Sequence, residues 1–193
     1  MFDRFLRPKS GTPEPVSSPQ DNPRPPATSA EGDTATVRRI VAKLEEMPPQ
    51  RARLIASAAY TLARAAHADL EISDEETAAI ERELQAHHEI DEATAVLVTE
   101  MAKLQAKTVG GTEDYVVTRE FKAIATDAQR LDVMRACFAI GAVNGTISAE
   151  ESAILNQIAS ELGLDDAQLN EIRSVFHEQL SSVQQIRRVT RGD

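Results

Sequence analysis

Residues 69–76 read Asp69-Leu70-Glu71-Ile72-Ser73-Asp74-Glu75-Glu76, and residues 144–151 read Asn144-Gly145-Thr146-Ile147-Ser148-Ala149-Glu150-Glu151. The two stretches align an acid or amide, an isoleucine, a serine and a glutamate at the same spacing. The pattern Ser-x-x-Glu is typical of a capping box, in which each of the two side chains accepts a hydrogen bond from the other residue's backbone amide. We therefore predict that a helix begins directly after Ser73 and another after Ser148, with each cap contributing about 1 kcal/mol.

The sequence on both sides of these stretches has the period of amphipathic helices. Between the periodic segments, Met47-Pro48-Pro49 and Gly110-Gly111 mark two helix ends. The expected helices cover residues 34–46, 50–68, 74–88, 91–107, 113–125, 127–143, 149–162 and 166–182. The sequence therefore predicts an all-α fold, a compact bundle of about seven or eight helices joined by short links.

Apolar spacing also assigns an inward face to each expected helix. In residues 50–68 that face contains Leu54, Ala58, Leu62 and Ala66. In residues 91–107 it contains Ala93, Val96, Leu97, Met101 and Leu104. In residues 166–182 it contains Leu169, Ile172, Phe176 and Leu180.

The two similar stretches belong to two similar halves, about residues 50–107 and 127–182. Each half is expected to comprise a helix, a tight loop, a helix, a short turn and a helix. Self-similarity of this kind is typical of duplication, so we predict an internal pseudo-twofold repeat that places the two loops in related positions.

The ends of the chain differ in composition from the domain expected over residues 34–182. Seven of the nine prolines fall between Pro8 and Pro26, so residues 1–33 are expected to form a disordered tail. At its tip, Phe2, Phe5 and Leu6 lie beside basic residues, a pattern that supports at most weak docking on a partner or membrane. Residues 183–193 are expected to form a basic C-terminal tail.

The charge restricts the classes of partner. The chain carries a net charge of −10, of which −9 lies after residue 33. An acidic surface repels phosphate backbones and anionic lipids, so we expect a protein partner or a cation and no nucleic acid. The single cysteine, Cys137, excludes an intramolecular disulfide, and no apolar signal or membrane-spanning stretch is evident, so we expect a cytoplasmic protein.

The two acidic stretches also overlay the last eight positions of a calcium-binding EF-hand loop. The first two ligand positions then fall on Ala65 and His67 in one copy and on Ile140 and Ala142 in the other. Calcium requires six to eight oxygen ligands, so neither copy is a working EF-hand, and a calcium site here has to be shared between elements. His67, Asp69 and Glu71 offer an alternative set of one nitrogen and two carboxylates for a transition metal.

The stretch Ala68-Asp69-Leu70-Glu71-Ile72-Ser73-x-x-Glu76 and its second copy resemble the characteristic loop of the TerB, or tellurite-resistance, family of bacteria. Similar domains occur attached to DnaJ-type co-chaperones. The resemblance implies one helical bundle without catalytic activity, a role in tellurite or other stress response, and acidic loop residues that bind a divalent metal ion such as Ca, Mg, Mn or Zn. Carried over by position, those residues are Asp69, Glu71, Glu76, Asn144 and Glu151.

Two hypotheses about function follow. In the first, the acidic loops bind a divalent cation. In the second, the chain is a module for protein–protein interaction or assembly, and the acidic motifs only cap helices. No Walker loop, GxGxxG, GxSxG or HExxH motif occurs, so we do not expect an enzyme. The sequence leaves the oligomeric state open.

Overall fold

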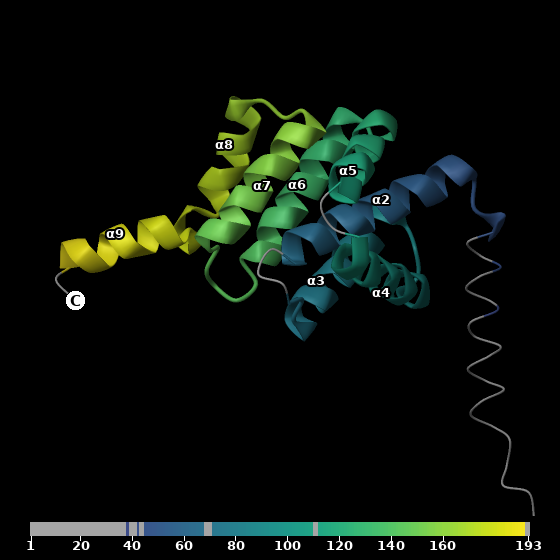
Figure 1. Ribbon diagram of the computed structural model, residues 1–193, viewed down its shortest axis with the longest axis horizontal. Helices are drawn as coiled ribbons and strands as arrows, with labels where there is room; N and C mark the ends of the chain where they lie inside the picture. The colour runs from purple at the N-terminus through teal and green to yellow at the C-terminus, as the bar shows by residue number, and fades with distance from the viewer. Residues whose placement is uncertain (1–37, 39–41, 43–44, 68–70, 110–111, 192–193) are drawn as a thin grey trace, which may run out of the picture. The chain divides into compact units, whose positions relative to one another are not determined.

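The computed structural model describes residues 38, 42, 45–67, 71–109 and 112–191, and the statements below concern these residues. The chain divides into two units, residues 1–37, which lie outside the described residues, and residues 38–193. The described part of the second unit forms eight α-helices and one 3-10 helix (Figure 1): α2 (Pro49–Ala66), α3 (Asp74–His88), α4 (Glu92–Val109), α5 (Thr112–Ile124), α6 (Asp127–Gly141), α7 (Ala149–Leu162), α8 (Asp166–Val175), η2 (His177–Gln179) and α9 (Ser181–Arg191). The predicted all-α bundle is confirmed. The expected helix over residues 34–46 lies mostly outside the described residues, although residues 38, 42, 45 and 46 are helical.

Helix α2 is the centre of the bundle. It packs against α3, α4, α5, α6 and α7, and its residues from Ser57 to Ala66 are all buried. A helix that is buried on every side needs small residues wherever a neighbour approaches closely, and alanine fills half of this stretch. The large side chains of the core therefore come mainly from the surrounding helices, and they include Ile80, Leu84, Phe121, Phe138, Leu155 and Leu162.

The inward face predicted for residues 91–107 was wrong. Met101 and Leu104 in α4 are 57% and 60% exposed, and Ala93 and Val96 are exposed as well. The buried stripe consists instead of small residues at helical spacing, Ala95, Thr99, Ala102 and Ala106. Helix α4 packs extensively on the alanine-rich surface of α2. Because the distance between two helix axes depends on the side chains at the contact, the small stripe faces inward and the larger residues are left outside.

The single helix predicted over residues 166–182 was also wrong. Helix α8 ends at Val175, and Leu180 has an extended backbone, with φ −65° and ψ 122°. Two contacts with distant residues account for the break. The Phe176 ring stacks on Phe138 with centroids 5.6 Å apart, and the backbone of Ile147 bonds to residues on both sides of Leu180. The Gln179 carbonyl accepts from the Ile147 amide at 2.7 Å, and the Ser181 amide donates to the Ile147 carbonyl at 2.9 Å.

The segment expected as a basic C-terminal tail is helical over most of its length. Helix α9 contacts η2, and the Arg187 guanidinium forms an ion pair with Glu178. This hydrogen-bonded pairing lowers the pKa of the Glu178 carboxyl below its usual range. Ile186 and Val189 on α9 are 65% and 83% exposed, so little apolar packing holds this helix to the bundle.

The two halves share an order of elements. Three helices, α2 to α4, form the first half, and α6 to α8 form the second. The predicted pseudo-twofold relation between the halves stays a prediction, and the third helices differ in length, with 18 residues in α4 and 10 in α8. In the described part of the chain, no helix is both long enough and apolar enough to cross a bilayer.

Candidate functional site

Both predicted capping boxes are present, and they fix the starts of α3 and α7. The Glu76 amide donates to Ser73 Oγ at 3.2 Å, and the Ser73 amide donates to Glu76 Oε2 at 2.8 Å. The Glu151 amide donates to Ser148 Oγ at 3.0 Å, and the Ser148 amide donates to Glu151 Oε2 at 2.6 Å. The two glutamates are buried, at 7% and 5% exposure. These hydrogen bonds offset the cost of burying a carboxylate.

We expect removal of one cap to have a modest effect on stability. Ser148→Ala leaves the Glu151 amide without its acceptor and should lower the free energy of unfolding by about 1 kcal/mol. Urea unfolding followed by circular dichroism measures this change. The control is Ser160→Ala, at an exposed position near the end of the same helix, which should stay within about 0.5 kcal/mol of the original protein. Equal effects of the two substitutions would contradict a role for the cap.

A cavity of about 480 Å³ lies between the two loops. The lining from the first loop and the start of α3 consists of Glu71, Ile72, Ser73, Glu75 and Glu76, and the lining before and in the second loop consists of Val143 and Asn144. The structure thus brings three of the predicted site residues, Glu71, Glu76 and Asn144, to one cavity. It adds Glu75, which the sequence did not single out.

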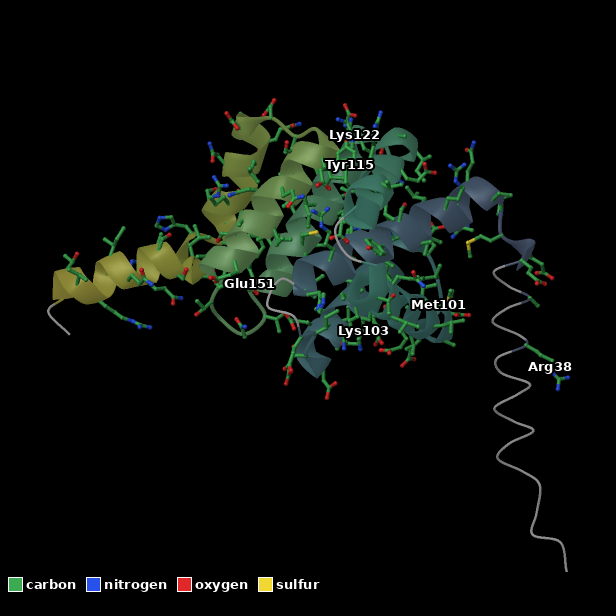
Figure 2. The ribbon with its side chains drawn as sticks, viewed as in Figure 1. Arg38, Met101, Lys103, Tyr115, Lys122 and Glu151 are labelled. Carbon is green, nitrogen blue, oxygen red and sulfur yellow. The ribbon has the colours of Figure 1, made fainter. Side chains whose placement is uncertain are left out.

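The other two predicted site residues are placed differently. Glu151 is not among the residues that line the cavity. Its carboxylate faces α6, with Oε1 3.8 Å from the position that a Cβ on Gly141 would take, and Figure 2 shows Glu151 at the start of α7. Asp69 lies outside the described residues. The described geometry therefore supports a site built mainly on the first loop.

Several oxygens at this site already serve local structure. Oε2 of Glu76 and Oε2 of Glu151 accept the capping hydrogen bonds. Oδ1 of Asn144 accepts from the Thr146 amide at 3.1 Å, which closes a turn around Gly145. Gly145 has φ +86°, a left-handed conformation that glycine adopts without strain. Asn144 and Gly145 of the second loop thus serve mainly to form this turn.

The donor chemistry of the cavity fits a hard divalent cation. Carboxylate and amide oxygens suit Ca, Mg and Mn, whereas zinc sites mostly use nitrogen and sulfur. Within the described ranges, no group of three or more His, Cys, Asp or Glu side chains is placed so that it could hold a metal ion. The described side chains alone therefore do not form a complete coordination shell at this cavity.

The EF-hand alignment places the first ligand position of each copy inside a helix. Ala65 belongs to α2 and Ile140 to α6, and the two residues are 2% and 0% exposed. This confirms that neither loop continues into an EF-hand. His67 follows α2 directly, and its Nδ1 is buried and has no hydrogen-bond partner among the described residues. The cavity-lining stretch begins four residues later, at Glu71. The three residues between them, 68–70, lie outside the described residues.

The sequence comparisons agree with this architecture. The family model for tellurite resistance protein TerB matches residues 54–174, a range that runs from within α2 to the last turn of α8 and includes both capped loops. The chain belongs to the TerB family. No curated protein and no solved structure gives a significant match to the chain.

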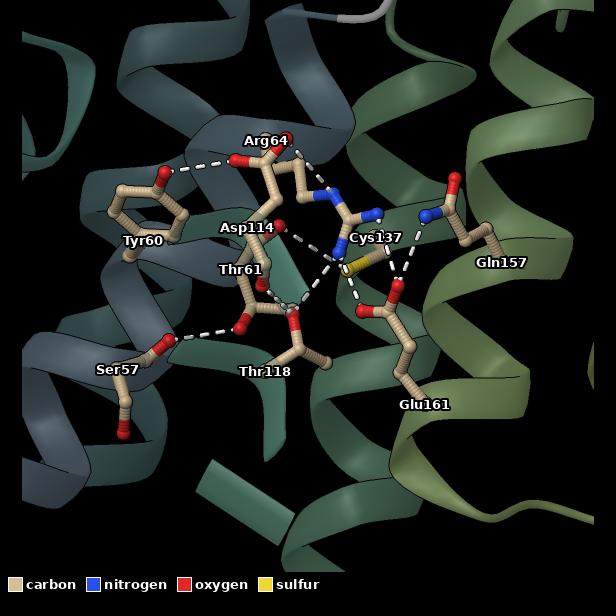
Figure 3. Close-up of polar contacts among 9 residues, drawn as sticks. All are labelled: Ser57, Tyr60, Thr61, Arg64, Asp114, Thr118, Cys137, Gln157 and Glu161. Atoms are coloured by element: carbon tan, nitrogen blue, oxygen red, sulfur yellow. Dashed lines mark hydrogen bonds and ion pairs between the residues drawn. The ribbon is translucent and has the colours of Figure 1, made fainter. Parts of the chain in front are cut away.

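A buried polar network inside the TerB-family domain was not predicted from the sequence (Figure 3). Arg64 on α2 is 5% exposed, and its guanidinium donates to both carboxylate oxygens of Glu161 on α7, at 2.5 and 3.2 Å. Thr118 on α5 accepts a further hydrogen bond from Arg64 at 3.1 Å. Asp114 lies 3.7 Å from Arg64 Nε and accepts from the Tyr60 hydroxyl at 2.7 Å. The network joins three helices of the bundle.

One sequence signal points to this network. Arg64 stands between Ala63 and Ala65 in the stretch of α2 that is buried on all sides. A charged residue at such a position requires a partner of opposite charge. The sequence does not say which carboxylate that is, because Glu161 lies 97 residues further along the chain.

Cys137 is a core residue. It is fully buried in α6, and its Sγ points at the Thr61 carbonyl at 4.0 Å. Burial raises the pKa of the thiol to about 12, so the thiolate that acts as a nucleophile is scarce at neutral pH.

Proposed function

We propose that this TerB-family domain is a non-catalytic cytoplasmic module of tellurite or other stress response, and that it binds a hard divalent cation between its two loops. The cavity that Glu71, Glu75, Glu76 and Asn144 share carries this proposal. It collects three carboxylates and an amide from segments about 70 residues apart in the chain. A bound cation would join the two loops.

Electrostatics favour a cation at this position. Acidic side chains that line one cavity give it a negative potential, which attracts a divalent cation. The chain after residue 33 carries a net charge of −9, which raises the local concentration of cations at the surface. Among the four ions named above, calcium, magnesium and manganese match the oxygen donors better than zinc does.

We expect the affinity for the cation to fall when the cavity-lining carboxylates outside the capping boxes are neutralised. In the full chain, titration with calcium, magnesium or manganese should give saturable changes, measured by calorimetry. The double substitution Glu71→Gln/Glu75→Gln should weaken the affinity at least about tenfold, because these side chains line the cavity. Glu92→Gln/Glu171→Gln removes the same charge from exposed positions and should leave the affinity nearly unchanged. Equal weakening by the two pairs would indicate diffuse attraction and no defined site.

A second candidate function is a protein-interaction or assembly module in which the acidic motifs only cap helices. The observation in its favour is that Oε2 of Glu76, Oε2 of Glu151 and Oδ1 of Asn144 already accept backbone hydrogen bonds. The two candidates differ in their response to one pair of substitutions.

In the second candidate, Glu76→Gln and Glu151→Gln lower the free energy of unfolding modestly, by about 0.5–1 kcal/mol each, because glutamine also completes a capping box. Neither substitution then alters the response to a cation. In the first candidate, Glu76→Gln also weakens cation binding, since Glu76 lines the cavity and Glu151 does not. Thermal unfolding with and without a large excess of calcium separates the two results.

A further inference from the structure

An apolar groove lies on the face where α2, α4 and α5 meet. Its volume is about 480 Å³, and its lining is dominated by small and apolar residues, among them Ala52, Ile55, Ala56, Val98, Met101, Ala102 and Val117. Arg53 and Glu120 are the charged residues of the described lining, and they form an ion pair with each other. The lining of the groove is therefore mostly apolar, and the charges of its one ion pair cancel.

The groove is bordered by apolar side chains that the described structure leaves uncovered. Met101 is 57% exposed, and Leu104, one turn further along α4, is 60% exposed (Figure 2 labels Met101). These are the residues whose spacing predicts an inward face for this helix. A contiguous apolar surface of this kind is typical of a docking site for another helix.

The chain just before α2 has the sequence of a suitable helix. Ile40, Val41, Leu44 and Met47 follow the spacing i, i+1, i+4, i+7, which places them on one face. Residues 38, 42, 45 and 46 are helical and exposed, and at this spacing they belong to the opposite face. Residues 39–41 and 43–44 lie outside the described residues, so their apolar face is identified from the sequence.

The connection to α2 favours an antiparallel arrangement with this segment. Only Met47 and Pro48 separate Glu46 from the first residue of α2, and helices joined by so short a link usually pack as antiparallel neighbours. Met47 itself already lines the groove and packs on the core. A helix over residues 40–46 would be about 10 Å long, and the groove-lining part of α2, residues 52–60, spans about 12 Å, so the lengths match.

We propose that residues 40–46 of the same chain dock as a helix in the groove between α2, α4 and α5, with Ile40, Val41 and Leu44 against Met101 and its neighbours. This proposal is independent of the cation site, because the groove shares no residue with the acidic cavity.

A spin label tests this placement in the full chain. Ala42→Cys places a reactive thiol on the exposed face of the segment, and the buried Cys137 stays unlabelled because its pKa is raised to about 12. With a nitroxide on residue 42, we expect strong paramagnetic broadening of the amide signals of Val98, Met101 and Gln105. The broadening should be lost when Leu44→Asp is added, and it should persist with Gln50→Asp, which adds the same charge at an exposed position of α2.

Two results would overturn the proposal. In the first, the labelled chain shows no broadening at α4, or broadening that Leu44→Asp does not remove. For the second, protein without ¹⁵N that carries the nitroxide is mixed with ¹⁵N-labelled protein that carries no nitroxide. Broadening of the α4 signals in this mixture means that the segment comes from a second copy. Unchanged amide shifts in α6, α7 and α8 show that each variant is folded, so a loss of broadening reports on docking alone.

Discussion

Replacement of Glu161 by methionine should lower the free energy of unfolding by about 3–5 kcal/mol. The substitution leaves the Arg64 guanidinium at the centre of the bundle, 5% exposed, without the carboxylate that accepts two of its hydrogen bonds. Asp114 cannot take over this role fully, because it lies 3.7 Å from Nε and accepts from Tyr60. Urea unfolding of the full chain, followed by far-ultraviolet circular dichroism, measures the loss.

The double substitution Arg64→Met/Glu161→Met separates the cost of an unpaired charge from the contribution of the pair. Apolar residues of similar volume often replace a buried ion pair without loss of stability, so we expect the double variant to be more stable than Glu161→Met alone. Glu100→Met is the surface control, since the Glu100 side chain is 56% exposed and its pair with Lys103 should contribute only about 0–1 kcal/mol. A loss below about 1 kcal/mol for Glu161→Met would contradict the importance of this pair.

Phe138→Ala should lower the free energy of unfolding by about 3–5 kcal/mol. Phe138 is 1% exposed in α6, and its ring stacks on Phe176, where α8 gives way to η2. The substitution creates a cavity and also removes the contact that holds the end of α8 against the bundle. Chemical unfolding measures the global effect, and amide hydrogen exchange around Ile147 measures whether the pairing with Gln179 and Ser181 becomes weaker.

Phe138→Leu is the conservative comparison, because it keeps an apolar side chain and loses only the ring. We expect a smaller loss than for alanine, together with faster exchange of the Ile147 amide. If both variants exchange at the original rate, the aromatic stack does not hold the C-terminal segment in place.

Local features of this fold follow from the sequence. The starts of α3 and α7 depend on a serine and a glutamate three residues later, and both partners of each capping box lie within one helical turn. Six of the helices, α2 to α7, occur within a few residues of their expected positions for the same reason, since helical periodicity is a local property.

The errors arise where distant contacts decide the outcome. Helix α4 turns its small residues inward because α2 presents alanines to it, whereas apolar spacing alone favours the larger Met101 and Leu104. The break after Val175 depends on Phe138 and Ile147, which lie in other helices and loops. The pairing of Arg64 with Glu161 and the addition of Glu75 to the acidic cavity likewise result from tertiary placement.

The central claim is that one cation binds between the two loops, and manganese tests it most directly because the bound ion broadens nearby nuclear resonances. With substoichiometric Mn²⁺ added to the full ¹⁵N-labelled chain, we predict selective broadening of the amides of Glu71, Glu75, Glu76 and Asn144, which line one cavity. Excess calcium should reverse the broadening by competing for the same oxygens. Broadening that is spread evenly over acidic surface residues, or that calcium does not reverse, would contradict the claim.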